Sequence, residues 1–272
     1  MEGPGVRFIA EGLAPLAGRI VTSAGGSSRI DYGKVTGQRL QRVHCIGKLL
    51  FLRFPRVSIR IHFLMWGRYR LNDPAEGKRP RLTLHFDDGT RLDFYTTAVV
   101  LLENPEVDRL HDPALDPMDE RWDAERSLAR AREKPDDLIC DTLMDQGVLA
   151  GPGNVIKNEV LFADRIHPAS LTRCVPDGIL RDLFLRVQDF SIRWLERKRQ
   201  GNRKPEISIY QKGTCPSCGG TVRSGRMGRL DRISFWCPAC QEEYRCGESV
   251  RERPGPSAGR SPLPRPSQRK TQ

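Results

Sequence analysis

The chain has 272 residues, of which 38% are hydrophobic, and this suffices for two compact domains with or without a small satellite. No stretch approaches the run of about 18 apolar residues that a transmembrane helix needs, and the opening sequence MEGPGVRF lacks the apolar segment of a secretory signal peptide. The 45 Lys and Arg outnumber the 34 Asp and Glu, and the net charge of +11 favours a polyanion such as nucleic acid as partner. A soluble protein that is merely basic is equally compatible with this charge.

Residues 1 to about 115 carry the short alternating and β-branched segments that are typical of a sandwich or barrel. We expect strands within residues 39–54, 57–65 and 81–86. A hairpin turn at Asp87-Asp88-Gly89-Thr90 then leads into a strand over residues 91–95. An early helix is expected within residues 6–16.

Residues 119–200 change to helical periodicity and predict a compact all-α domain. We expect helices over residues 119–132, from Pro135 to Gly147, over residues 155–165, and from Pro176 to about residue 199. A linker follows at residues 201–209. The last residues, 247–272, are dominated by Arg, Pro, Ser and Gly, which predicts a disordered basic tail that either contacts DNA non-specifically or has no role.

Four of the eight cysteines form two C-x2-C pairs separated by eighteen residues, namely Cys215, Cys218, Cys237 and Cys240. Four thiolates at this spacing predict one closed, tetrahedral, structural Zn²⁺ site that staples a hairpin too small to fold alone. A redox role lacks the βαβ context that such pairs usually have. Without an export signal a disulfide framework is a poor explanation for the other four, and we expect Cys45, Cys140, Cys174 and Cys246 to be buried or inert thiols.

The segment Gly151-Pro-Gly153-Asn154 predicts a tight turn that leads into a helix. Such a turn can present backbone N–H groups and the positive end of the helix dipole to a phosphate, although Pro152 lacks one donor. Asn154 is expected either to cap the helix or to donate its amide to the phosphate. The alternative interpretation is an ordinary helix-cap turn.

Two longer segments carry a family resemblance. Residues 143–168, LMDQGVLAGPGNVIKNEVLFADRIHP, resemble the helix–two-turns–helix signature of the formamidopyrimidine-DNA glycosylase and endonuclease VIII family, and residues 210–241 resemble its zinc finger. The resemblance covers residues 1 to about 243 and implies an α+β fold. We expect a catalytic β-sandwich domain at 1–117, a helix–two-turns–helix domain at 118–205, a zinc finger at 206–246, and the tail at 247–272.

The same resemblance implies four DNA-contacting residues. Lys48, Asn154 and Arg232 stand where the family contacts phosphate, and Met65 lies in the loop that fills the gap left by a flipped base. Without the resemblance, Lys48 would be an ordinary outward-facing strand residue and Met65 a core methionine. The Arg-Arg-Phe triplet of the formamidopyrimidine branch is absent from residues 95–100, which favours the endonuclease VIII branch and weakens the case for 8-oxoguanine.

The N-terminus departs from the family pattern. The family usually begins Met-Pro-Glu-Gly-Pro-Glu, and the proline amine, exposed by removal of Met, attacks the sugar. Here Met1-Glu2-Gly3-Pro4-Gly5 places Glu2 on the catalytic Glu but offers no proline. We interpret Met1 as retained, with its α-amine as the nucleophile and Glu2 moving protons. The open alternatives are loss of glycosylase activity with AP lyase activity kept, a DNA-damage-binding protein without chemistry, and a wrongly assigned start codon.

The resemblance therefore implies a base-excision-repair DNA glycosylase with AP lyase activity, acting on oxidised bases, mainly pyrimidines. The expected partner is damaged double-stranded DNA, and the expected cofactor is one structural Zn²⁺. We expect a monomer that does not bind membranes and lies with the nucleoid in the bacterial cytoplasm.

Overall fold

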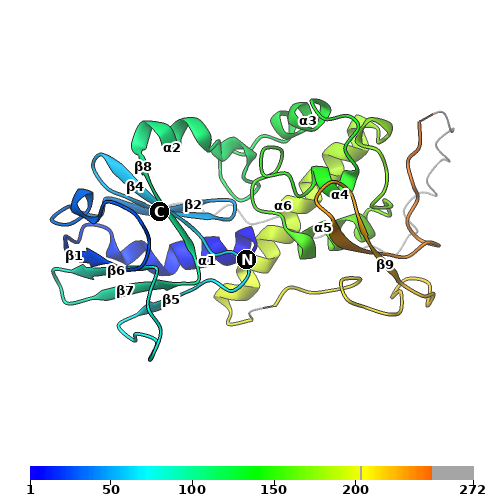
Figure 1. Ribbon diagram of the computed structural model, residues 1–272. Helices are drawn as coiled ribbons and strands as arrows, with labels where there is room; N and C mark the ends of the chain where they lie inside the picture. The colour runs from blue at the N-terminus through cyan, green and yellow to red at the C-terminus, as the bar shows by residue number, and fades with distance from the viewer. Residues whose placement is uncertain (203, 247–272) are drawn as a thin grey trace, which may run out of the picture.

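Two hydrophobic cores organise the chain, one built within residues 6–99 and the other within residues 128–244. The computed structural model describes residues 1–202 and 204–246, so the tail predicted at 247–272 lies outside the described residues. Figure 1 shows two lobes with the N-terminus between them, and the long helix α6 (Asp177–Arg199) reaches across to contact α1 (Gly3–Leu13). Within the described ranges, no helix is both long and apolar enough to cross a membrane.

The N-terminal lobe contains two four-stranded antiparallel sheets, ordered β1-β6-β7-β5 and β2-β3-β4-β8. Helix α1 packs on β2 and β3 through Val6, Ile9, Ala10 and Leu13, which share one helical face. The hairpin predicted at Asp87–Thr90 joins two of the strands. The strands are β1 (Val21–Gly25), β2 (Arg42–Ile46), β3 (Leu49–Arg53), β4 (Val57–His62), β5 (Arg68–Leu71), β6 (Leu82–Phe86), β7 (Arg91–Tyr95) and β8 (Ala98–Glu103).

The second lobe is helical and carries a small hairpin at its end. The helices predicted over residues 119–132 and from Pro135 to Gly147 start later and are shorter in the structure. Asp123 caps α3, so this helix starts at Ala124, and Leu138 pairs with Leu171 in a β-bridge that restricts α4 to one turn. The elements of this lobe are α3 (Ala124–Arg132), α4 (Ile139–Thr142), α5 (Asn154–Ala163), α6, β9 (Arg223–Met227) and β10 (Arg232–Trp236), with the 3-10 turns η3 (Pro113–Leu115) and η4 (Thr172–Cys174). The N-terminal lobe also contains α2 (Asn104–Leu110), which contacts β4 and β8, and the 3-10 turns η1 (Ala14–Leu16) and η2 (Tyr32–Lys34).

The prediction for the four scattered cysteines is wrong for two of them. Cys174 in η4 forms a disulfide with Cys246, and their Cα atoms lie 5.0 Å apart. The bond joins the helical lobe to the segment that follows the hairpin, across a sequence separation of 72 residues that gives no local signal. Cys45 and Cys140 are buried as expected, and burial raises the pKa of these thiols to about 12 and about 11.

Candidate functional site

The N-terminal segment lies at the junction of the two lobes and caps a helix of the other lobe. The Glu2 carboxylate accepts hydrogen bonds from the backbone N–H groups of Gly153 (3.0 Å), Val155 (2.8 Å) and Ile156 (3.2 Å) at the start of α5. Gly3 N–H also donates to the Gly151 carbonyl at 3.0 Å. A Cβ at Gly153 would lie only 2.6 Å from the Glu2 side chain, so glycine is required for this approach.

This arrangement corrects the expectation that the turn at residues 151–154 cradles a phosphate with its backbone. The free N–H groups of a helix N-terminus attract any anion, and here a carboxylate of the same chain already accepts three of them, those of Gly153, Val155 and Ile156. Asn154 is the first residue of α5 and does not cap it. Its Oδ1 is buried and accepts no hydrogen bond within the described part of the chain, so its side-chain amide stays uncommitted.

Lys48 lies in the two-residue turn between β2 and β3, whereas a position on a strand was expected from the sequence. Gly47 before it has a φ of 54°, and a Cβ there would lie 2.7 Å from the Gly151 backbone nitrogen. Gly47 N–H donates to the buried Asp116 carboxylate at 2.9 Å. This close contact between the lobes presents Lys48 to the N-terminal segment.

Several positive groups surround the N-terminal amine. Burial lowers the pKa of the Met1 α-amine, Glu2 opposes this effect, and the charges of Lys48 and Arg232 add to it. Burial also lowers the pKa of Lys48, again opposed by Glu2 and reinforced by Arg232. The amine donates to the Leu64 carbonyl at 2.8 Å. A lowered pKa increases the neutral, nucleophilic fraction of the amine at neutral pH.

The loop that holds this carbonyl exposes three large apolar side chains in a row. Leu64, Met65 and Trp66 are 46%, 68% and 77% exposed, and they project from a tight turn closed by a 2.7 Å hydrogen bond from Gly67 N–H to the Phe63 carbonyl. Met65 was predicted to be a core methionine or a wedge, and its exposure favours the wedge. Trp66 was missed, although a large aromatic residue directly before a turn glycine is a recognisable signal.

Arg232 is the first residue of β10 and is exposed. It forms no ion pair with any described residue, whereas Arg226 and Arg229 on the same hairpin pair with Asp231 and Asp137. Its charge lowers the pKa values of Met1 and Lys48, so it lies close enough to the N-terminal segment to act on it electrostatically. Arg232 thus differs from its two neighbours in having no acidic partner among the described residues, and its contact with phosphate stays a prediction.

Three consecutive polar residues of α5 hold the hairpin in place. Glu159 accepts the backbone N–H groups of residues 208, 209 and 210 at 2.7–3.1 Å, and Asn158 accepts that of Phe235 at 2.7 Å. Lys157 donates to the Ile233 carbonyl at 3.1 Å and to the Ser234 hydroxyl at 2.8 Å. None of these three residues was predicted from the sequence. A buried polar triplet inside an otherwise apolar helix is the signal that could have found them.

The four paired cysteines converge as their spacing predicts. Sulfur atoms of Cys215 and Cys240 lie 3.8 Å apart, those of Cys218 and Cys237 3.5 Å apart, and all four lie within 4.8 Å of one another. The cluster could therefore hold one metal ion, and a set of four thiolates suits a tetrahedral cation.

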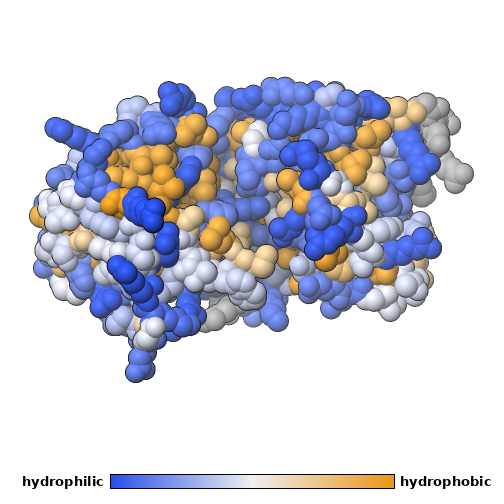
Figure 2. Space-filling view, viewed as in Figure 1, coloured by the Kyte–Doolittle hydropathy of each residue, from blue (hydrophilic) through white to orange (hydrophobic). Residues whose placement is uncertain are grey.

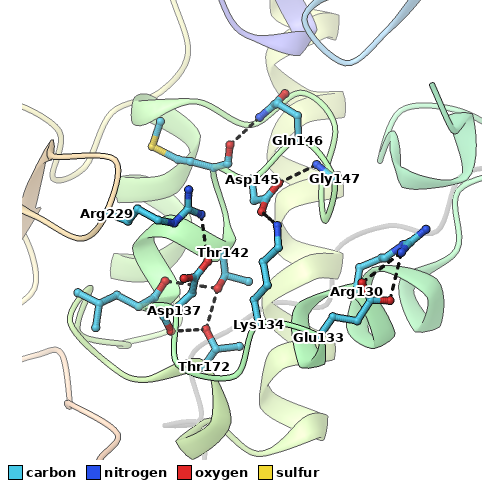
Figure 3. A network of polar contacts seen from close by, with 12 residues as sticks. Arg130, Glu133, Lys134, Asp137, Thr142, Asp145, Gln146, Gly147, Thr172 and Arg229 are labelled. Carbon is cyan, nitrogen blue, oxygen red and sulfur yellow. Dashed lines mark hydrogen bonds and ion pairs between the residues drawn. The ribbon is translucent and has the colours of Figure 1, made fainter. Parts of the chain in front are cut away.

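A cavity of about 400 Å³ opens between the lobes beside Lys48 and His62. Its other wall comes from α2, from α3 and from the loop at residues 146–150. Figure 3 shows that Arg130 and Lys134 on this wall are paired with Glu133 and Asp145. Lys48 and Arg109, which also line the cavity, form no such pairs with described residues. The face of the helical lobe seen in Figure 2 is largely hydrophilic.

Comparisons with known proteins agree with this architecture. The family model described as "Formamidopyrimidine-DNA glycosylase N-terminal domain" matches residues 1–97, and the "Formamidopyrimidine-DNA glycosylase H2TH domain" model matches residues 114–196. Endonuclease 8-like 2 of Bos taurus is 35% identical over 211 residues, which cover 72% of this chain and 62% of the relative. Endonuclease 8-like 3 of Xenopus laevis is 29% identical over 234 residues, which cover 82% of this chain and 38% of the relative.

Solved structures show the same fold. A viral DNA glycosylase matches with a TM-score of 0.77 at 20% identity, and the Lactococcus lactis Fpg in complex with abasic-site DNA matches with a TM-score of 0.76 at 21% identity; each match covers 89% of this chain and 100% of the other. The predicted α+β fold, a β-sandwich lobe followed by a helical lobe with a cysteine cluster near a hairpin, is confirmed. The chain belongs to the formamidopyrimidine-DNA glycosylase and endonuclease VIII family, and its relatives are of the endonuclease VIII-like kind. It spans roughly two fifths to three fifths of the length of these curated relatives.

Proposed function

We propose that this chain is a base-excision-repair DNA glycosylase with AP lyase activity, acting on oxidised bases, mainly pyrimidines, in double-stranded DNA. The observation that carries the proposal is the grouping at the lobe junction of an amine with a lowered pKa, a carboxylate and unpaired cations beside an exposed apolar loop. Each of these groups answers one requirement of the reaction. Family membership supports the same activity.

We assign DNA binding to the charged and polar side chains that have no partner within the described chain. Lys48 and Arg232 offer charge to phosphates on either side of the site, and the uncommitted amide of Asn154 offers a donor. Leu64, Met65 and Trp66 form a wedge that occupies the space left by a flipped nucleotide. The 2.8 Å bond from the Met1 amine to Leu64 places this wedge next to the nucleophile.

The chemistry follows from the amine and Glu2. The neutral Met1 amine attacks C1′, the glycosidic bond breaks, and the departing base takes up a proton. Opening of the sugar ring leaves a protonated Schiff base between Met1 and C1′. Removal of a C2′ proton then expels the 3′ phosphate by β-elimination, and we assign these proton transfers to Glu2, whose carboxylate lies at the lobe junction beside the start of α5. Hydrolysis of the Schiff base releases the amine.

Reduction of the Schiff base tests this proposal. Borohydride should trap a covalent adduct between the untagged protein and AP-site DNA, and the crosslinked peptide should contain Met1. Intact-protein mass measured beforehand establishes that Met1 is the terminus. A permanent N-terminal extension converts the amine to an amide and should abolish trapping, and DNA with a tetrahydrofuran site serves as a control because it cannot form the imine. Tight binding of AP-site DNA without any adduct would instead establish a damage-binding protein without chemistry.

We also propose that the cluster of Cys215, Cys218, Cys237 and Cys240 holds one structural Zn²⁺. The geometry of the four sulfurs supports it. The ion would staple the hairpin that carries Arg232 and would take no part in the reaction.

A further inference from the structure

Lys157 of α5 is a buried cation, and its hydrogen bonds to the hairpin do not by themselves explain why a charged residue stands there. Its side chain is 1% exposed, and lysine is almost never fully buried unless it is paired with an acid. Its ammonium donates to the Ile233 carbonyl and the Ser234 hydroxyl, both on β10, and forms no ion pair with any residue of 1–202 or 204–246. Two neutral acceptors do not neutralise a buried charge.

The nearby acids are already occupied. Glu2 accepts the N–H groups at the start of α5, and Asp141 of α4 accepts those of Arg229 and Leu230. Burial lowers the pKa of Lys157 to about 8, and Arg232 of β10 lowers it as well. Cys140 and Asp141 of α4 and Glu2 of the N-terminal segment act in the opposite direction. The balance leaves the charge only partly compensated in the free protein.

The position of Lys157 connects it to the phosphate contacts. Asn154, with its uncommitted amide, precedes it by three residues and therefore lies on the same side of α5. Ile233, whose carbonyl it binds, directly follows Arg232, which is exposed and has no acidic partner in the described chain. Lys157 thus lies beneath the surface at which Asn154 and Arg232 would bind a phosphate.

We propose that Lys157 is a positioning residue for that phosphate: it fixes the start of β10, and its buried charge is compensated when a DNA phosphate binds at Arg232 and Asn154. This inference rests on the proposed DNA binding. Its consequence is a proton linkage. Phosphate favours the charged ammonium, so binding raises the pKa of Lys157 above its value in the free protein, and the complex takes up a proton between the two values. Affinity therefore falls as the pH rises through that window, which begins near pH 8.

The test measures the affinity of the full chain for duplex DNA that carries a tetrahydrofuran site, from pH 7 to pH 9.5. Wild-type affinity should fall by up to tenfold for each unit by which binding raises the pKa, and calorimetry at pH 8.5 in two buffers of different ionisation enthalpy should show proton uptake. Lys157→Gln keeps a donor but no charge. It should bind about as weakly at pH 7 as the wild type does at pH 9.5, with a flatter profile and reduced proton uptake. Subtracting the pH profile of Lys157→Gln from that of the wild type removes the contributions of Met1 and Lys48, because these groups titrate in both proteins.

Two further variants separate charge from packing. Ser234→Ala removes one hydrogen bond but not the charge, so it should keep the wild-type pH dependence. Lys157→Arg carries a charge that does not titrate, so it should bind tightly and lose the part of the pH dependence that comes from Lys157, even if Lys157→Gln fails to fold. Proton uptake that is unchanged in Lys157→Gln or Lys157→Arg, or absent from the wild type, would overturn the inference. If Arg232→Ala binds DNA as tightly as the wild type, the proposed phosphate contact itself is wrong.

Discussion

Glu2 should stabilise the folded protein measurably, apart from any catalytic role. Glu2→Gln preserves the volume of the side chain but replaces one carboxylate oxygen with an NH₂ group. In the structure Oε2 accepts from Gly153 and Ile156, and Oε1 accepts from Val155. The amide oxygen can replace only one of these acceptors, so the NH₂ group must face at least one N–H donor. The substitution also removes the negative charge from the positive end of the α5 dipole.

The loss of one buried acceptor and of the charge together predict a destabilisation of about 2 kcal/mol. For a protein of this size that lowers the midpoint of thermal unfolding by roughly 4–8 °C. Glu11→Gln on α1 is the matched control, because Glu11 forms an exposed pair with Arg199 at 2.6 Å, and such pairs contribute less than about 1 kcal/mol. Melting curves at pH 7 compare the two variants. If Glu2→Gln unfolds at the same temperature as Glu11→Gln, the cap does not stabilise the junction.

Three further predictions concern the DNA contacts, the metal and the disulfide. Arg232→Ala and Lys48→Ala should each weaken DNA binding and reduce the slope of log affinity against log salt by roughly one, whereas Arg226→Ala should leave the slope unchanged because Arg226 is paired with Asp231. Cys237→Ser should lose bound zinc, measured by atomic absorption, and should lose DNA affinity while the N-terminal lobe stays folded by circular dichroism; full affinity without metal contradicts the assignment. Cys174→Ser should lower stability by about 4 kcal/mol under oxidising conditions, given the 72-residue separation of the bonded cysteines, and the difference from the wild type should vanish in dithiothreitol.

Structural features that depend on short segments could be predicted from the sequence. The alternation in β2, the turn at residues 87–90 and the spacing of the four paired cysteines each depend on neighbours a few residues apart, so local chemistry determines them. The family motifs then supplied Arg232 as a predicted phosphate contact, and among the described residues it has no acidic partner, whereas Arg226 and Arg229 are paired.

Features that depend on contacts between residues distant in the sequence could not be predicted from it. Periodicity alone predicted a helix from Pro135 to Gly147, but a bridge between Leu138 and Leu171 shortens it. The same limit applies to the disulfide of Cys174 with Cys246. It applies also to the start of α5, where an isolated turn predicts an open anion site and only the tertiary structure shows that Glu2 fills it.

The capping role of Glu2 explains why this residue suits a site between two lobes. An acid that moves protons must be held at a fixed position relative to the sugar, and three backbone donors fix the Glu2 carboxylate more rigidly than side-chain contacts would. These donors belong to α5, whose next turn supplies Lys157 and Asn158 to the hairpin that bears Arg232. If DNA binds at Arg232 as proposed, we therefore expect a displacement of Arg232 to be transmitted through this one short helix to Glu2. It follows that variants in α5 should alter DNA affinity and elimination rate together, whereas variants of the wedge residue Trp66 should change the affinity for flipped substrates alone.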